Sequence, residues 1–88
     1  MLYIVIETYL DGPKPVYERF AAKGRMLPDG LEYVDSWVDA ATHSRCFQLM
    51  RAEQRDVLDV WIRRWSDIVA FEVVEVVSSS DASRAYRA

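Results

Sequence analysis

The sequence predicts an α+β domain whose strands and helices follow the order β-α-β-β-α-β. Three observations support this prediction: apolar, β-branched segments at the start and near the end of the chain, two alternating segments between them, and two stretches with helical spacing. The chain has 88 residues, which is enough for one domain and too few for two.

The first strand is expected at residues 2–9 and the first helix at residues 15–23. LYIVIETY, residues 2–9, is β-branched and aromatic with almost no break, so this strand is expected at the centre of the sheet. Turn residues follow at 11–13, and Pro15 suits the first turn of a helix, where its missing N–H costs little. Gly24 supplies the left-handed conformation that commonly ends a helix.

The middle of the chain predicts a β-hairpin. LEYVDSWVDA, residues 31–40, and RCFQLMRA, residues 45–52, both alternate and are joined by a loop of about five residues. In residues 54–68 one helical stripe is formed by Leu58, Trp61, Ile62, Trp65 and Ile68. AFEVVEVVSS, residues 70–79, is the expected last strand.

Elements in this order pack as a four-stranded antiparallel sheet with two helices on one face, the ferredoxin-like arrangement. We expect a single domain over residues 1–79 and a loose C-terminal tail over residues 80–88, which show no periodicity.

Composition argues against several classes of partner. The net charge is −3 and the eleven Lys and Arg residues are spread along the chain, so nucleic acid is not an expected partner. No segment reaches the roughly 20 apolar residues of a membrane span, and the apolar start lacks the features of a signal peptide. A single cysteine, Cys46, indicates a reducing compartment, and the cytoplasm is expected. With His43 as the one histidine, no metal-ligand spacing exists, and no metal or cofactor is expected.

Two helices cover one face of the sheet, yet the first and last strands are apolar on both sides. A bare apolar face of that size predicts a partner, and a homodimer through the open face would form a closed α+β barrel. The uniformly aliphatic side is assigned to the helices, namely Leu2, Ile4, Ile6, Phe47 and Leu49 with Val34 and Val38. The open face then holds Tyr3, Val5, Glu7, Tyr33, Asp35, Trp37, Cys46, Gln48 and Met50. For the last strand, Glu72 and Glu75 remain alternatives as the inward carboxylate.

Asp35 and Gln48 are the candidate catalytic residues, because a carboxylate beside an amide in an aromatic-lined cavity can orient a phenol or enol and accept its proton. The candidate ligand-binding residues are Tyr3, Arg25, Tyr33 and Trp37. The alternative for Asp35 is structural, either an ion pair with an arginine such as Arg25 or a contact with the partner chain. Trp61 and Trp65 are expected in the core, Cys46 as a buried small hydrophobe, and His43 in the hairpin loop.

The stretches MLYIVIETY, GRMLPDGLEYVDSWV, CFQLMRA and VLDVWIRRWSDIVAFEVVEV together resemble a family of short bacterial proteins catalogued as domain of unknown function 3303. More loosely, the element order resembles the dimeric α+β barrel superfamily, which includes cofactor-free quinone-forming monooxygenases, haem-degrading monooxygenases, muconolactone isomerases and stress-responsive barrel proteins. The resemblance implies the fold and a dimer, whereas fold does not imply function.

Two functions of different class follow. The first is a site for a small aromatic or anionic molecule in a cavity next to the sheet, acting as a cofactor-independent monooxygenase or isomerase. The second is a non-enzymatic dimerisation or interaction module with no ligand site. Whether the protein is an enzyme is left open by the sequence. A cavity of roughly 300 Å³ or more would favour the first function.

Overall fold

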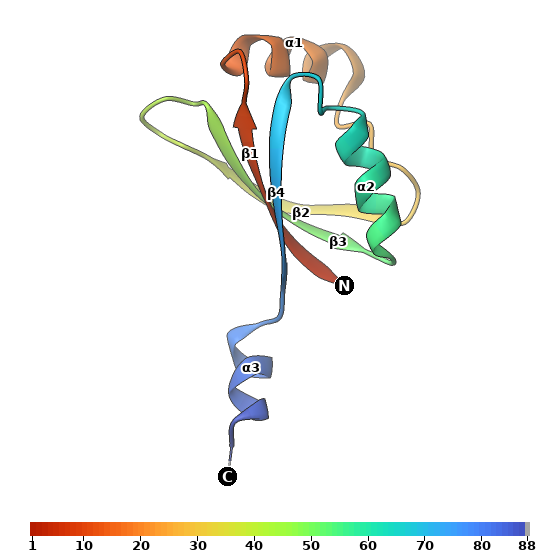
Figure 1. Ribbon diagram of the computed structural model, residues 1–88, viewed down its shortest axis with the longest axis vertical. Helices are drawn as coiled ribbons and strands as arrows, with labels where there is room; N and C mark the ends of the chain where they lie inside the picture. Colours follow the sequence, from red (N-terminus) through yellow and green to blue (C-terminus); the bar gives the residue numbers. More distant parts are fainter. Residues whose placement is uncertain (88) are drawn as a thin grey trace.

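The computed structural model describes residues 1–87 and has the predicted order of elements with one more helix at the end. The elements are β1 (Leu2–Tyr9), α1 (Pro13–Lys23), β2 (Leu31–Val38), β3 (Arg45–Ala52), α2 (Arg55–Arg63), β4 (Val69–Val76) and α3 (Ser79–Ala85). The four strands form one antiparallel sheet in the order β2-β3-β1-β4, so β1 is central as predicted (Figure 1). In residues 1–87 no helix is long and apolar enough to cross a membrane.

The element boundaries differ from the prediction at both helices and at two strands, since β2 ends at Val38 instead of residue 40 and β4 spans Val69–Val76 instead of residues 70–79. β1 and β3 have the predicted limits. α1 begins at Pro13, because Gly12 adopts a φ of 77° and two prolines fit the first helical turn. At its other end the N–H of Gly24 donates to the Phe20 carbonyl at 2.8 Å. α2 ends at Arg63, so the last part of the helical stripe, including Trp65, lies in the following turn.

The predicted loose tail contains a short helix. α3 begins after Ser78, whose hydroxyl accepts a hydrogen bond from the backbone N–H of Asp81 at 3.0 Å. Asp81 and Arg84 form an ion pair along the helix. Figure 1 shows α3 beyond the end of the sheet, and none of its residues is buried.

The prediction of which sheet face the helices cover was wrong for β1 and β3, whereas on β2 it was right for Asp35, Trp37 and Val38. Tyr3, Val5 and Met50, assigned to the open face, are at most 1% exposed under the helices. Residues of the opposite parity on β1 and β3 lie on the open face and are only partly buried, namely Leu2, Ile4, Ile6, Phe47 and Leu49. The assignment assumed that the more uniformly aliphatic side meets the helices. Because β1 is apolar on both sides, that rule could not choose between them.

A β-bulge in β2 changes the alternation of the segment 31–38. Tyr33 pairs with Met50 whereas Asp35 pairs with Leu49, so Val34 is the extra residue. Odd-numbered residues of β2 face the helices before the bulge and even-numbered residues do so after it. Tyr33 and Ser36 therefore both lie on the helix side. Asp35 and Trp37 are on the open face. On β4, Glu75 pairs with Tyr3 on the helix side and Glu72 lies on the open face, and both carboxylates are exposed.

The core lies between the sheet and α2. Leu58 and Trp61 of α2 are 0% and 2% exposed, and the Trp61 ring meets Phe71 of β4 edge to face at 5.6 Å. This confirms the prediction that Trp61 and Trp65 are core residues. α1 buries only Val16.

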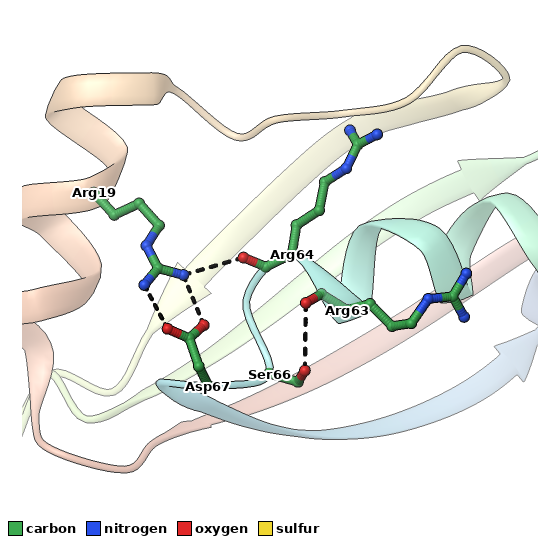
Figure 2. A network of polar contacts seen from close by, with 5 residues as sticks. All are labelled: Arg19, Arg63, Arg64, Ser66 and Asp67. Atoms are coloured by element: carbon green, nitrogen blue, oxygen red, sulfur yellow. Dashed lines mark hydrogen bonds and ion pairs between the residues drawn. The ribbon is translucent and has the colours of Figure 1, made fainter.

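A polar contact ties α1 to the segment between α2 and β4. Figure 2 shows Arg19 donating to both carboxylate oxygens of Asp67, at 2.8 and 2.6 Å, and to the Arg64 carbonyl at 3.1 Å. The guanidinium also lies 5.5 Å from the centre of the Trp65 ring. The helix is therefore held at its middle while its inner side faces a cavity.

Candidate functional site

A cavity of about 210 Å³ lies between the helix-covered face of the sheet and α1. Its polar wall is formed by Glu7, Arg25, Ser36 and Gln48, and its apolar wall includes Val16, Phe20 and Trp65. The volume is below the roughly 300 Å³ at which pockets for drug-sized ligands begin, so the cavity suits a smaller molecule.

Glu7 and Gln48 form the most buried polar pair of the cavity. β1 and β3 place them on adjacent strands, where they are 5% and 7% exposed. The Gln48 Nε2 donates to Glu7 Oε2. The Gln48 Oε1 is buried and accepts no hydrogen bond from residues 1–87. An unsatisfied buried acceptor of this kind is costly in a core and common at functional sites.

Burial sets the charge state of Glu7. Removal from water raises the pKa of its carboxyl to about 7, against the opposing effects of the Gln48 hydrogen bond and of Arg25. Near neutral pH the carboxyl is thus divided between its two forms. A group that both accepts and gives up protons at the working pH is suited to acid–base chemistry.

The groups beside Glu7 stay neutral. Burial, with the nearby charge of Glu7, raises the pKa of the Cys46 thiol to about 11, and burial also raises the pKa of Tyr9. Cys46 is a free, buried cysteine, as the sequence predicted. Tyr9 meets Tyr17 of α1 edge to face at 6.4 Å, which forms an aromatic side of the cavity.

Arg25 reaches the cavity from the connector between α1 and β2. Its guanidinium carbon lies 3.6 Å from the centre of the Tyr33 ring and 5.1 Å from that of Phe20. The predicted alternative, an ion pair with Asp35, is not formed: within residues 1–87 Arg25 has no carboxylate partner. The Tyr33 hydroxyl shares a 2.6 Å hydrogen bond with Ser36 Oγ.

The structure divides the predicted site residues into two groups. Gln48 and Arg25 line the cavity, and Tyr33 lies beside Arg25. The others, Tyr3, Asp35 and Trp37, do not line it. Tyr3 is 1% exposed in the core, where its hydroxyl contacts the Met1 sulfur at 3.8 Å.

Asp35 and Trp37 are separated from the cavity by the sheet. Asp35 is exposed on the open face, where its carboxylate accepts from the N–H of Ser36 at 2.8 Å. Trp37 is 54% exposed on the same face. The expected pairing of Asp35 with Gln48 fails because the bulge and the inverted faces place the two side chains on opposite sides.

Comparison with known proteins places the chain in a family. The sequence profile described as Domain of unknown function (DUF3303) matches residues 1–88. This chain belongs to the DUF3303 family. Among curated proteins, none matches this DUF3303 protein.

One solved structure resembles the DUF3303 protein along most of its length. It is described as the crystal structure of an antibiotic biosynthesis monooxygenase, with a TM-score of 0.53 and 20% sequence identity. The match covers 89% of this chain and 100% of the other. At this identity the likeness supports the ferredoxin-like α+β fold and leaves the chemistry to be argued from the cavity.

Sequence reasoning missed Glu7 as a site residue of the DUF3303 protein. Its signal was the one carboxylate within LYIVIET, in a strand predicted to be central and buried on both faces. A charged group in such a strand is desolvated whichever face it occupies, and buried charges are rare without a function or a partner.

Proposed function

We propose that this protein binds a small, single-ring weak acid in the cavity and that Glu7 removes its proton. The observation behind the proposal is the buried Glu7 carboxyl on the cavity wall, with an amide donor and an unpaired guanidinium beside it. A base with a pKa of about 7 can accept a proton at neutral pH and return it in a later step.

The groups around Glu7 have complementary roles in such a proton transfer. When a phenol or enol loses its proton to Glu7, negative charge moves to the ligand oxygen. Arg25 is the cation that would stabilise this charge, and the low-dielectric cavity strengthens the interaction. Gln48 orients the Glu7 carboxylate by donating to one of its oxygens.

Two reaction classes share this first step. In an isomerase, Glu7 returns the proton to a different atom of the enolate. In a cofactor-independent monooxygenase, dioxygen adds to a ring carbon of the phenolate, and the resulting hydroperoxide loses water to leave a quinone. The fold likeness to an antibiotic biosynthesis monooxygenase supports the second class, and the small cavity limits the ligand to about one ring.

We further propose that the protein is a homodimer through the open face of the sheet. On that face Trp37 is 54% and Val74 42% exposed, next to the partly buried Ile4 and Ile6. Exposed apolar side chains gathered on one sheet face are typical of an interaction surface. The same observation supports the second candidate function, a dimerisation module without a ligand.

A coloured weak acid tests the proton-transfer proposal. 4-Nitrophenol has a single ring, and its phenolate absorbs visible light whereas the neutral phenol does not. At pH 7 we expect binding to the wild-type protein to increase the phenolate fraction and raise the melting temperature. Glu7→Gln should lose the spectral change, because the amide has nearly the same shape as the carboxyl group but cannot accept the proton.

Glu75→Gln is the matched control, since Glu75 lies on the same face of the sheet outside the cavity. It should keep the wild-type response. If neither 4-nitrophenol nor a panel of single-ring phenols and enols changes the spectrum or the melting temperature, the proton-transfer function is wrong, and the dimerisation module is the better description.

A further inference from the structure

Arg25 acts on Glu7 electrostatically, but no carboxylate of residues 1–87 is in contact with its guanidinium. Its guanidinium covers the Tyr33 ring at 3.6 Å and lies 5.1 Å from the Phe20 ring, and it forms no ion pair within residues 1–87. An aromatic face attracts the positive charge but is a weak hydrogen-bond acceptor. The N–H donors of Arg25, which suit the two oxygens of a carboxylate, are therefore free to meet a ligand in the cavity.

The backbone of Arg25 is held by two tryptophans. Its carbonyl accepts the indole N–H of Trp61 at 2.9 Å and that of Trp65 at 3.0 Å. Both indoles are almost fully buried, at 2% and 5% exposure. A carbonyl oxygen can accept two hydrogen bonds, so the two indoles occupy both acceptor positions of the Arg25 carbonyl.

The next residue of the connector is fixed in the same way. Arg64 donates to the Met26 carbonyl at 2.7 Å. Met26 has a φ of 59°, a left-handed conformation that non-glycine residues rarely adopt and that persists only when its surroundings impose it. Side chains of α2 and the following turn thus hold two consecutive carbonyls, which places the Arg25 side chain over Tyr33.

We infer that Arg25 recognises a carboxylate on the ligand and that Trp61 and Trp65 are its positioning residues. This inference rests on the proposed function, because it concerns the same cavity. The ligand class becomes a single-ring acid that carries an ionisable hydroxyl for Glu7 and a carboxylate for Arg25.

The charges around the cavity favour an anion over a neutral ring. The titratable groups that face Glu7 and Arg25 are Tyr9, Tyr17, Tyr33 and Cys46. Burial keeps Tyr9 and Cys46 neutral, and Glu7 is only partly ionised at pH 7. A neutral ligand would cover the half-buried guanidinium without supplying an opposite charge, which is unfavourable, whereas a carboxylate would compensate its charge.

Binding of a carboxylate should be coupled to protonation of Glu7. In the free protein Arg25 lowers the pKa of Glu7 against the larger effect of burial. A ligand carboxylate that neutralises Arg25 removes this lowering, so the pKa of Glu7 rises and part of the complex takes up a proton from solvent. Only complexes in which Glu7 is still ionised can accept the hydroxyl proton of the ligand. Affinity for the anion is therefore expected to decrease as the pH rises through 7.

The test compares 4-hydroxybenzoate with phenol, which has the same ring and hydroxyl but no carboxylate. Binding is measured by NMR titration of the full-length protein at pH 6 and pH 8. We expect wild-type protein to prefer 4-hydroxybenzoate by about ten-fold or more at pH 6, as for a charge-assisted pair. Arg25→Gln should lose this preference and bind the two probes with similar affinity.

Trp61→Phe tests the positioning role, because it removes one N–H donor and keeps an aromatic ring in the core. It should reduce the ratio of the 4-hydroxybenzoate affinity to the phenol affinity. Trp65→Phe serves the same purpose if Trp61→Phe fails to fold. Trp37→Phe, on the open face, is the control and should keep the full preference.

The outcomes separate this inference from the proposed function. Equal affinity of the wild-type protein for both probes, or a preference that survives Arg25→Gln, would overturn the role of Arg25 while Glu7-dependent phenol binding remained. Unchanged preference in both tryptophan variants would overturn the positioning role. Absence of binding by either probe at millimolar concentration would contradict both the inference and the proposed function.

Discussion

At the scale of single residues, the burial of Glu7 makes the stability of the protein depend on pH. The pKa of its carboxyl is about 7 in the folded protein and 4.5 ordinarily, so the folded state binds the proton more tightly. Glu7 makes its full contribution to the free energy of unfolding below pH 4.5. As the pH rises to 7, about 3 kcal/mol of this contribution is lost. The free energy of unfolding, measured with urea from pH 4.5 to 8, should fall accordingly in the wild type.

Glu7→Gln should remove this pH dependence, because the amide does not titrate. The exposed Glu75→Gln variant should retain it. A Glu7→Gln protein whose unfolding free energy still decreases by the wild-type amount over this range would show that another group is responsible.

Gln48 offers a second prediction at the residue scale. Its Nε2 lowers the pKa of Glu7 through a hydrogen bond, while its Oε1 is buried without a donor. Gln48→Met keeps the length of the side chain and removes both atoms, so the pKa of Glu7 should rise above 7. Carbon NMR of the Glu7 carboxyl measures this directly. Gln54→Met, an exposed change at the start of α2, should leave the Glu7 titration unchanged.

Site residues were predictable where the signal lies within one segment of the sequence, and were missed where it depends on pairing between strands. Gln48 and Tyr33 were identified because polar and aromatic side chains stood out in short alternating strands, and Arg25 because it follows Gly24 at the end of the first helix. Asp35 was grouped with Gln48 because strict alternation was assumed, and the extra residue Val34 breaks it. A bulge is set by pairing between strands and leaves little trace in one strand alone.

At the scale of elements, the periodic signals located the strands and helices. The alternation of residues 45–52 and the apolar run of residues 2–9 gave both strands their observed limits. The helical stripe continued past Arg63 because Trp65 and Ile68 are buried or half-buried in a turn, where packing and not helix geometry spaces them. α3 was missed because its helix is defined by the Ser78 cap and an ion pair, with no apolar stripe.

The attachment of α1 gives a prediction at the element scale. α1 buries only Val16, and Arg19 connects it to Asp67 and to the Arg64 carbonyl (Figure 2). Arg19→Met keeps the contact with the Trp65 ring and removes the charged donors. We expect faster amide hydrogen exchange in α1 and unchanged exchange in β1 and β3, because the helix opens locally.

Lys14→Met is the control for α1, since its ion pair with Glu18 spans 3.9 Å between two exposed side chains. Exchange in α1 should stay at the wild-type rate in this variant. Equal exchange rates in Arg19→Met and the wild type would show that the Arg19 contacts do not hold the helix.

At the scale of the whole molecule, the two faces of the sheet have different compositions. The helix-covered face combines large apolar residues with the polar cavity pair Glu7 and Gln48, whereas the middle of the open face is aliphatic and aromatic and the carboxylates Asp35 and Glu72 lie on its outer strands. From the sequence, the more apolar face of the sheet was assigned to the helices, because an apolar face is usually buried by another part of the same chain. A second copy can also bury it, and a single chain cannot distinguish the two cases.

The last prediction concerns this open face and uses residues that are exposed in one chain. Trp37→Glu on β2 and Val74→Glu on β4 alter side chains that are 54% and 42% exposed, so each variant should fold. In a two-fold dimer each substitution occurs twice, and two carboxylates would have to be buried at one interface. Light scattering at micromolar concentration should give the mass of a dimer for the wild type and of a monomer for both variants. Leu10→Glu, equally exposed in the turn before α1, should remain dimeric. A monomeric wild-type protein, or variants that stay dimeric, would show that the open face is not the interface.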